Sequence, residues 1–178
     1  MRNTAINLVR QAHAARRENR LTDAHRDLVE AVALCRQDGA QRELVQALRG
    51  LGQIERDLGR GDAARPLYEE AVAIARAEGE PLALAHAVRH LGDLHHDAGR
   101  IELAERCYDE ALAVYRSHKD TLPLDLANAI RPLGVLKDNA GEVDEARRLL
   151  EEARDLYTSV NVREGVVECS FRLDRLSP

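Results

Sequence analysis

One short segment, HAVRHLGDLHHDAGR, holds four of the seven histidines of the chain and could form a metal site. His86 and His90 are four residues apart, so both imidazoles share one face of a helix, and Asp93 or Asp97 could complete a ligand set. The metalloprotease motif H-E-x-x-H is absent, because alanine follows the first histidine. A catalytic metal would need further ligands from neighbouring helices, and the candidate residues there, Gln46, Gln53, Asn128 and Val135, are poor ligands. We therefore predict no cofactor, and a metal-binding protein centred on His86 and His90 is an alternative.

No other residue pattern indicates catalysis. The glycines recur at a fixed period instead of clustering in a phosphate-binding loop, and no Ser or Cys stands in a recognisable nucleophile setting with His and Asp. Basic residues interleaved with aromatic residues, as in single-strand nucleic-acid binders, are also absent. We predict that the chain is not an enzyme.

The charge and composition exclude several classes of partner. The net charge is −5 with 32% charged residues, whereas nucleic-acid binders are usually basic. The basic residues that could favour nucleic acid are local, at Arg10, Arg16 and Arg17 and in the column of Arg49, Arg89 and Arg131. No segment approaches ~20 consecutive apolar residues, and the first residues lack the apolar core of a signal peptide. Three distant cysteines without C-x-x-C spacing are typical of buried thiols in a reducing compartment. We predict a cytoplasmic protein with neither membrane nor nucleic acid as a partner.

The abundance of Ala, Leu, Arg and Glu favours an all-α fold, and the chain repeats itself. The aligned columns are the pairs Leu51-Gly52, Leu91-Gly92 and Leu133-Gly134, the glycines Gly59, Gly99 and Gly141, and the alanines Ala64, Ala104, Ala146 and Ala71, Ala111, Ala153. Every column steps by 40 and then by 42 residues, and a fainter copy precedes the three clear ones. The chain is therefore an array of about four similar units.

Each repeat predicts two antiparallel helices. The second glycine should end the first helix in a left-handed conformation, and Asp62, Glu102 or Asp144 should open the second helix, where acidic groups are favoured. The short connection forces the helices antiparallel. The mid-helix glycines at 52, 92 and 134 cost ~1 kcal/mol each relative to alanine, which indicates close helix approach. We expect the alanines of the second helix to fill the facing side of that contact.

This pattern resembles the tetratricopeptide repeat (TPR) family in its Leu-Gly pair, the alanine twelve residues later, the large residue at Tyr68, Tyr108 and Leu150, and the closing alanine. The 40-to-42-residue period exceeds the ~34 residues of the common repeat and is similar to the longer variety of kinesin light chains and cell-polarity adaptors. The chain departs from the family where a tyrosine is usual, since Glu55, His95 and Lys137 stand there. The resemblance implies an α-solenoid in a right-handed superhelix.

We predict one TPR-like domain over residues 1–178, with repeats at about 3–38, 41–78, 81–118 and 122–160 and a closing helix at 162–176. The expected helices are 3–18, 22–38, 41–58, 62–78, 81–98, 102–118, 122–140, 144–160 and 162–176. In the closing helix, an apolar stripe from Val162 to Leu176 should cover the end of the stack. Val167 and Phe171 lie off this stripe and either broaden the buried face or offer a partner contact.

The resemblance implies a concave groove lined by the first helix of each pair. At about 100° per residue, His86, His90, Asp93 and Asp97 share one face, and His95 points into the stack. Equivalent residues elsewhere are Gln46, Gly50, Gln53 and Asp57, then Asn128, Pro132, Val135 and Asn139, with Ile6, Arg10, His13 and Arg17 in the faint repeat. A neighbouring column starts at Val9 and continues as Arg49, Arg89 and Arg131, with ~10 Å expected between adjacent helices.

These columns predict a non-enzymatic protein-protein interaction module that binds a peptide segment of a partner protein. Arg49, Arg89 and Arg131 would anchor acidic or carboxylate groups, and Gln53, His86, His90, Asp93 and Asn128 would set specificity. The open alternative is that these arginines pair with neighbouring aspartates and only carry solvated charge. We expect the histidine patch to change charge near pH 6.5 and to make binding pH-sensitive. A self-associating scaffold, or homo-oligomer, with Phe171 and Val167 at the contact is the alternative function.

Overall fold

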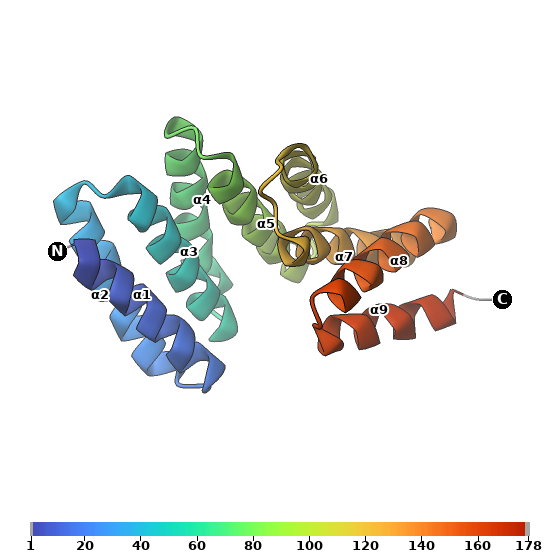
Figure 1. The fold of residues 1–178 in the computed structure, drawn as a ribbon, viewed down its shortest axis with the longest axis horizontal. Helices are drawn as coiled ribbons and strands as arrows, with labels where there is room; N and C mark the ends of the chain where they lie inside the picture. Colours follow the sequence, from blue (N-terminus) through green and yellow to red (C-terminus); the bar gives the residue numbers. More distant parts are fainter. Residues whose placement is uncertain (1, 177–178) are drawn as a thin grey trace. The chain divides into compact units, whose positions relative to one another are not determined.

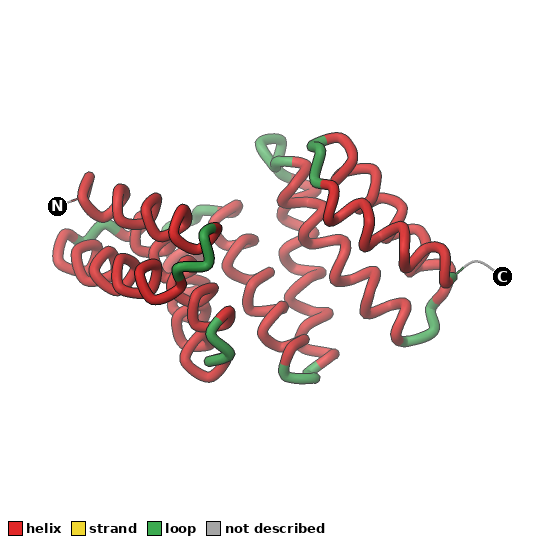
Figure 2. Tube along the Cα trace, turned by 90° about the horizontal axis from the view of Figure 1, so that it is seen from below, coloured by secondary structure: helices red, strands yellow, loops and turns green. Residues whose placement is uncertain are grey.

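The computed structural model describes residues 2–176, and helices connected by short loops account for all of that range (Figure 2). The helices, labelled in Figure 1, are α1 (Arg2–Arg17), α2 (Leu21–Asp38), α3 (Gln41–Asp57), α4 (Gly61–Ala77), α5 (Pro81–Asp97), α6 (Ile101–Ser117), α7 (Pro123–Asn139), α8 (Val143–Ser159) and α9 (Arg163–Arg175). The predicted all-α fold and its helix pairs are confirmed, and each predicted helix end lies within one residue of the observed end.

The helices group into two compact units, one ending at Leu94 and the other beginning at His95. In the first unit α1 packs on α2, α3 on α4, and α3 also contacts both α2 and α1. In the second unit α7 packs on α8 and α6, and α9 lies beside α8 (Figure 1). Each unit is thus built from neighbouring antiparallel helices, as the short loops require.

The helix ends follow the predicted turn chemistry. Gly59, Gly99 and Gly141 have φ values of 75°, 70° and 76°, the left-handed conformation that glycine adopts without steric cost. The acidic residues Asp62 and Glu102 lie in the first turn of α4 and α6 instead of capping them. Their carboxylates therefore act on the positive end of the helix dipole.

The residues just before α4, α6 and α8 contact the preceding helix instead of capping the helix that they begin. Arg60, Arg100 and Glu142 make no side-chain hydrogen bond to their own helix ends. Instead, each reaches back five residues, to the positions where the family usually has tyrosine. The pairs are Arg60 Nη1 to Glu55 Oε2 at 3.5 Å, Arg100 Nε to His95 Nδ1 at 3.0 Å and Lys137 Nζ to Glu142 Oε1 at 3.1 Å. A polar contact across the helix turn thus replaces the usual aromatic residue.

Two of these positions also bind the preceding helix pair. His25 Nε2 of α2 lies 2.7 Å from Glu55 Oε1, whose side chain is buried. In the second unit Lys137 Nζ of α7 lies 2.5 Å from Glu105 Oε1 of α6. Because charged groups are seldom buried without a partner, these pairs explain how the repeats tolerate Glu55 and Lys137 at this position.

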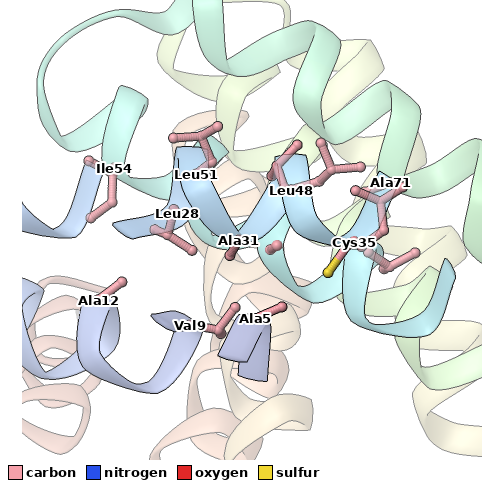
Figure 3. Close-up of a cluster of buried hydrophobic side chains, with 14 of the residues drawn as sticks. Ala5, Val9, Ala12, Leu28, Ala31, Cys35, Leu48, Leu51, Ile54 and Ala71 are labelled. Carbon is pink, nitrogen blue, oxygen red and sulfur yellow. The ribbon is translucent and has the colours of Figure 1, made fainter. Parts of the chain in front are cut away.

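The core of the first unit is made of small and aliphatic side chains from α1, α2 and α3, joined by Ala71 of α4 (Figure 3). Ala24, Ala31 and Ala47 are fully buried, so the helix axes can approach closely at these points. Cys35 belongs to the same cluster. The buried alanines explain how a core with a single Phe and no Trp is filled.

The mid-helix glycines Gly52 and Gly134 mark close approaches, but the nearest side chains are not the alanines that we expected. The nearest atoms to a Cβ built at Gly52 belong to the ring of Tyr68, at 2.7 Å from Cε1. At Gly134 they belong to Leu150 and Leu149, at 3.1–3.2 Å. The expectation was wrong because the large residue of the second helix leans over the first, and the glycine leaves room for it.

The closing helix α9 buries part of its predicted stripe. Cys169 is fully buried and Leu173 nearly so, whereas Val162, Val166 and Leu176 are half-buried. Val167 and Phe171 are 58% and 63% exposed, so they do not broaden the buried face. Of the two options open for this pair, only an external contact is compatible with this exposure.

Candidate functional site

The first unit contains a hollow of about 360 Å³ on the face formed by α1, α3 and α5. Its lining is Val9, Ala12, His13 and Arg16 of α1, Leu28 of α2, Gln46, Arg49, Gly50, Gln53 and Ile54 of α3, and His90 of α5. Of the predicted site residues, Arg49, Gln53 and His90 therefore share one concave surface. First helices line most of it, as the helical phase predicts.

The floor of the hollow is apolar and its rim is polar. Val9, Ala12 and Ile54 are buried core residues that contribute one wall. Gly50 allows close packing here, since a Cβ at this position would lie 2.8 Å from Leu28 Cδ2. The rim carries two arginines, two glutamines and two histidines, and its lining includes no carboxylate. Such a hollow suits a ligand with an apolar body and an anionic group.

Arg16 is a lining residue that the helical phase did not select. Its Nε lies 2.5 Å from Asp57 Oδ2, and Gln53 Nε2 donates to Asp57 Oδ1 at 2.8 Å. Asp57 thus holds one arginine and one glutamine of the rim in place. The predicted neighbours in the faint repeat, Ile6, Arg10 and Arg17, do not line the hollow, because α1 turns Val9, Ala12 and His13 toward it instead. No sequence signal distinguishes Arg16 from Arg17.

Arg89 lies within an extensive polar network on α5. Its side chain is 14% exposed, its Nη1 donates to Asp93 Oδ2 at 3.1 Å, and its Nη2 lies 2.9 Å from His90 Nε2. Asp93 is also 3.6 Å from Arg56 Nη1 of α3. The alternative that an arginine of the column pairs with a neighbouring aspartate therefore holds for Arg89.

This network selects one form of His90. Because the Arg89 guanidinium can only donate, His90 Nε2 must accept, which leaves the ring proton on Nδ1. Nδ1 lies 3.4 Å from Asp93 Oδ2, so the ring is in electrostatic contact with that carboxylate. The ring also stacks on Tyr68 of α4, with 5.5 Å between centroids and 7° between planes. His90 is therefore held as the neutral imidazole.

The pKa values of the groove histidines differ from the expectation. Burial, together with the positive charge of Arg49 and Arg89, lowers the pKa of His86 to about 3. Burial, followed by Arg89, lowers the pKa of His90 to about 3. Burial and the charges of Arg49, Arg16 and Arg17 also lower the pKa of His13. The expected charge change of the His86 and His90 patch near pH 6.5 is therefore wrong, because burial, and after it the positive field of the arginines, opposes protonation.

These pKa values predict that the chain loses stability as the pH falls from 6.5 toward 3. Unfolded histidines bind a proton near pH 6.5, whereas His90 stays neutral in the folded chain until about pH 3, so acid favours the unfolded state in this window. Between pH 7 and pH 5 the free energy of unfolding should fall by about 2 kcal/mol for this histidine. Urea unfolding at the two pH values measures the difference. His90→Gln should reduce this difference by about 2 kcal/mol, while His86 and His13 continue to contribute to it, and a variant with the full wild-type difference would contradict the assignment.

The described residues offer little for a metal ion. Within residues 2–176 no group of three His, Cys, Asp or Glu side chains is arranged to bind one. Both ring nitrogens of His90 already face partners, Arg89 on one side and Asp93 on the other. A metal at His86 and His90 would have to displace the arginine.

The remaining predicted residues belong to the second unit. Asn128 Oδ1 accepts a hydrogen bond of 2.9 Å from Tyr157 Oη of α8. Arg131, 33% exposed, pairs with Glu168 of α9. Both side chains thus connect α7 to the helices that follow it, and Arg131 keeps part of its surface open to solvent.

In the part of the chain that the structure describes, no helix combines the length and apolar character needed to span a bilayer. A search of curated proteins returns no match. A protein-family model for the tetratricopeptide repeat matches residues 43–117 and again 82–159, which together cover most of the chain.

Two solved structures show the same fold. One is BtubC (BKLC) from P. vanneervenii, with a TM-score of 0.74 and 20% identity over 88% of this chain and 64% of that one. The other contains the nearly identical TPR-like repeats of a proposed kinesin light chain from Podosopora anserina, with a TM-score of 0.70 and 14% identity over 99% of this chain and 96% of that one. The chain thus spans less than two thirds of BtubC.

Proposed function

The chain belongs to the tetratricopeptide repeat family, and from that premise we propose that it is a non-enzymatic interaction module that binds an acidic peptide segment of a partner protein. The supporting observation is the hollow on α1, α3 and α5, whose lining includes Arg49 and also Arg16, the partner of Asp57. A positive site of this kind attracts carboxylate groups and repels cationic segments.

The electrostatics of neighbouring histidines support a positive potential in the hollow. The charge of Arg49 contributes to the lowered pKa of His13, His86 and His90, which lie on two different helices. Burial is the largest cause of each shift, and the charge of Arg49 adds to it at all three imidazoles. An acidic ligand would meet this field beside Arg49, whereas at Arg16 it would compete with Asp57.

We assign Arg49 the role of anchor. Its guanidinium can bind a carboxylate through two parallel hydrogen bonds, and the amides of Gln46 and Gln53 lie on the same rim, where they can pair with the peptide backbone. Val9, Leu28 and Ile54 offer an apolar surface for the methylene groups of the bound side chain. His90 borders the hollow as a neutral ring held by Arg89 and Asp93, and His86 lies on the same face of α5.

In the second unit, the same proposal rests on Arg131 and Asn128. Arg131 is partly exposed beside Glu168, so an acidic segment would compete with that carboxylate. Asn128 uses its oxygen for Tyr157, which leaves its amide hydrogens to bind a peptide carbonyl. We also propose a cytoplasmic location, supported by Cys35, Cys107 and Cys169, which form no disulfide.

Reversing the charge of Arg49 should abolish binding of acidic peptides. Hydrogen bonds to charged groups contribute about 1.5–3 kcal/mol, so even Arg49→Gln should weaken binding by roughly 10-fold to 100-fold, and Arg49→Glu should weaken it further. The probe is a synthetic peptide array of Asp-rich and Glu-rich sequences beside the same sequences with Asn and Gln. Titration of the best acidic peptide, followed by fluorescence anisotropy, gives the dissociation constants.

Arg106→Glu is the matched control, because it makes the same change in net charge at an exposed position of α6. It should bind like the wild type, and circular dichroism should show that all variants keep their helices. The proposal fails if wild-type protein binds the acidic and the amide arrays equally, or if Arg49→Gln retains full affinity for the best acidic peptide.

A further inference from the structure

The outer face of α9 presents an exposed apolar pair. Val167 and Phe171, one helical turn apart, are 58% and 63% exposed and border a shallow hollow of about 640 Å³ with Arg163, Glu164 and Glu168. The guanidinium of Arg175 lies 6.0 Å from the centre of the Phe171 ring. Two large apolar side chains exposed side by side form a contiguous patch, and such patches are typical of interaction sites.

The repeat register shows that the residues equivalent to Val167 in the other first helices are buried. The spacing places it in one column with Val45, Ala85 and Ala127, which are 2%, 0% and 0% exposed. The column is thus covered in α3, α5 and α7 and open in α9. Phe171 follows one turn later, in the column that carries Arg49, Arg89 and Arg131 in the other helices. An aromatic residue has replaced a charged one at the open position.

Charged residues flank this pair in a definite order. At about 100° per residue, Arg163 and Asp174 fall on one side of the line from Val167 to Phe171, and Glu164 and Arg175 fall on the other side. All four are exposed, and within residues 2–176 Arg163, Glu164 and Asp174 form no ion pair. Each side of the Val167–Phe171 pair therefore has one charge toward the amino end of α9 and the opposite charge toward its carboxyl end.

We infer that a second copy of this chain covers Val167 and Phe171, with the two α9 helices antiparallel. A two-fold axis midway between Val167 and Phe171 sets each valine against the phenylalanine of the other copy. The same axis brings Arg163 beside Asp174 and Glu164 beside Arg175 of the second copy, twice each by symmetry. Antiparallel helix dipoles also attract, and the pairing of a small with a large side chain fills the contact evenly.

Sedimentation equilibrium over a range of concentrations tests this inference. The wild type should approach twice the mass of the single chain as concentration rises, and Phe171→Asp should remain monomeric. Val29→Asp is the matched control, because Val29 of α2 is also an exposed aliphatic residue, 46% accessible, and it should associate like the wild type. A wild type that is monomeric at its highest soluble concentration would overturn the inference. The surface of Val167 and Phe171 would then be covered by a different protein or by none.

Charge exchange tests the antiparallel order itself. Glu164→Arg and Arg175→Glu should each be monomeric, because each sets like charges together in its own dimer. Mixed in equal amounts, they should associate again, since the arginine introduced in the first variant then meets the glutamate introduced in the second, and the other contact keeps its native pair. Glu151→Arg, on the exposed face of α8, controls for the change in net charge. If the single variants associate normally, or if mixing restores nothing, the proposed pairing is wrong.

Discussion

Replacing Arg89 by leucine is expected to lower the free energy of unfolding by about 3 kcal/mol, the usual cost of removing one partner from a buried ion pair. Arg89 and Asp93 are 14% and 13% exposed, so water can replace little of what the guanidinium provides. Leucine would leave His90 Nε2 without its donor and leave the Asp93 carboxylate with a weaker contact to Arg56 at 3.6 Å. The stacking of His90 on Tyr68 would transmit the loss to α4.

Urea unfolding monitored by circular dichroism measures this loss. The double variant Arg89→Leu with Asp93→Leu should recover most of the stability, because replacing both charges by apolar groups avoids a buried carboxylate that has lost its Arg89 partner. Arg106→Leu, at an exposed position of α6, should change stability by no more than about 0.5 kcal/mol. A loss for Arg89→Leu similar to that of Arg106→Leu would show that the network contributes little.

The arginine column shows what the sequence could and could not predict about the site. Arg49, Arg89 and Arg131 occupy the same helical phase, so the repeat makes them look equivalent. Their environments differ because their neighbours differ: Arg49 lines the hollow, Arg89 binds Asp93 four residues along the same helix, and Arg131 pairs with Glu168 of α9. Helical phase finds a shared face, but only the packed side chains show that the three arginines have different neighbours.

The helices themselves were predictable almost to the residue. The turn residues carry that information, because a left-handed glycine such as Gly59 or Gly99 can end a helix with little strain, and its position is visible in the sequence. The pKa values of His86 and His90 were not predictable, since they depend on burial and on arginines contributed by separate helices. Local signals determine the elements, whereas the electrostatics of the site arise only when α3 and α5 are packed.

Gly52→Ala is expected to destabilise the chain by about 2 kcal/mol, although alanine is the better helix former. A new Cβ at this position would lie 2.7 Å and 2.9 Å from Cε1 and Cζ of Tyr68. That ring is fully buried and stacked on His90, so it has nowhere to move. The overlap should therefore outweigh the helix-propensity gain of ~1 kcal/mol.

The fourth repeat provides the internal comparison. At Gly134 the new Cβ would lie 3.1–3.2 Å from aliphatic atoms of Leu150 and Leu149, which can shift by a few tenths of an ångström. Gly134→Ala should thus stay within about 1 kcal/mol of the wild type, because relaxation and helix propensity offset each other. Thermal and urea unfolding of both variants gives the ranking, and a Gly52→Ala chain at least as stable as Gly134→Ala would contradict it.

A double-mutant cycle identifies the cause of the loss at Gly52. Tyr68→Leu gives the second repeat the same pair of residues as the fourth, where glycine already faces leucine. In that background Gly52→Ala should cost less than it does beside Tyr68, so the two changes should not add. Strict additivity would mean that the ring is not what excludes the methyl group. The glycine column would then reflect backbone approach alone, and the aromatic residue of the second helix would not be the reason why this family keeps a glycine in the middle of a helix.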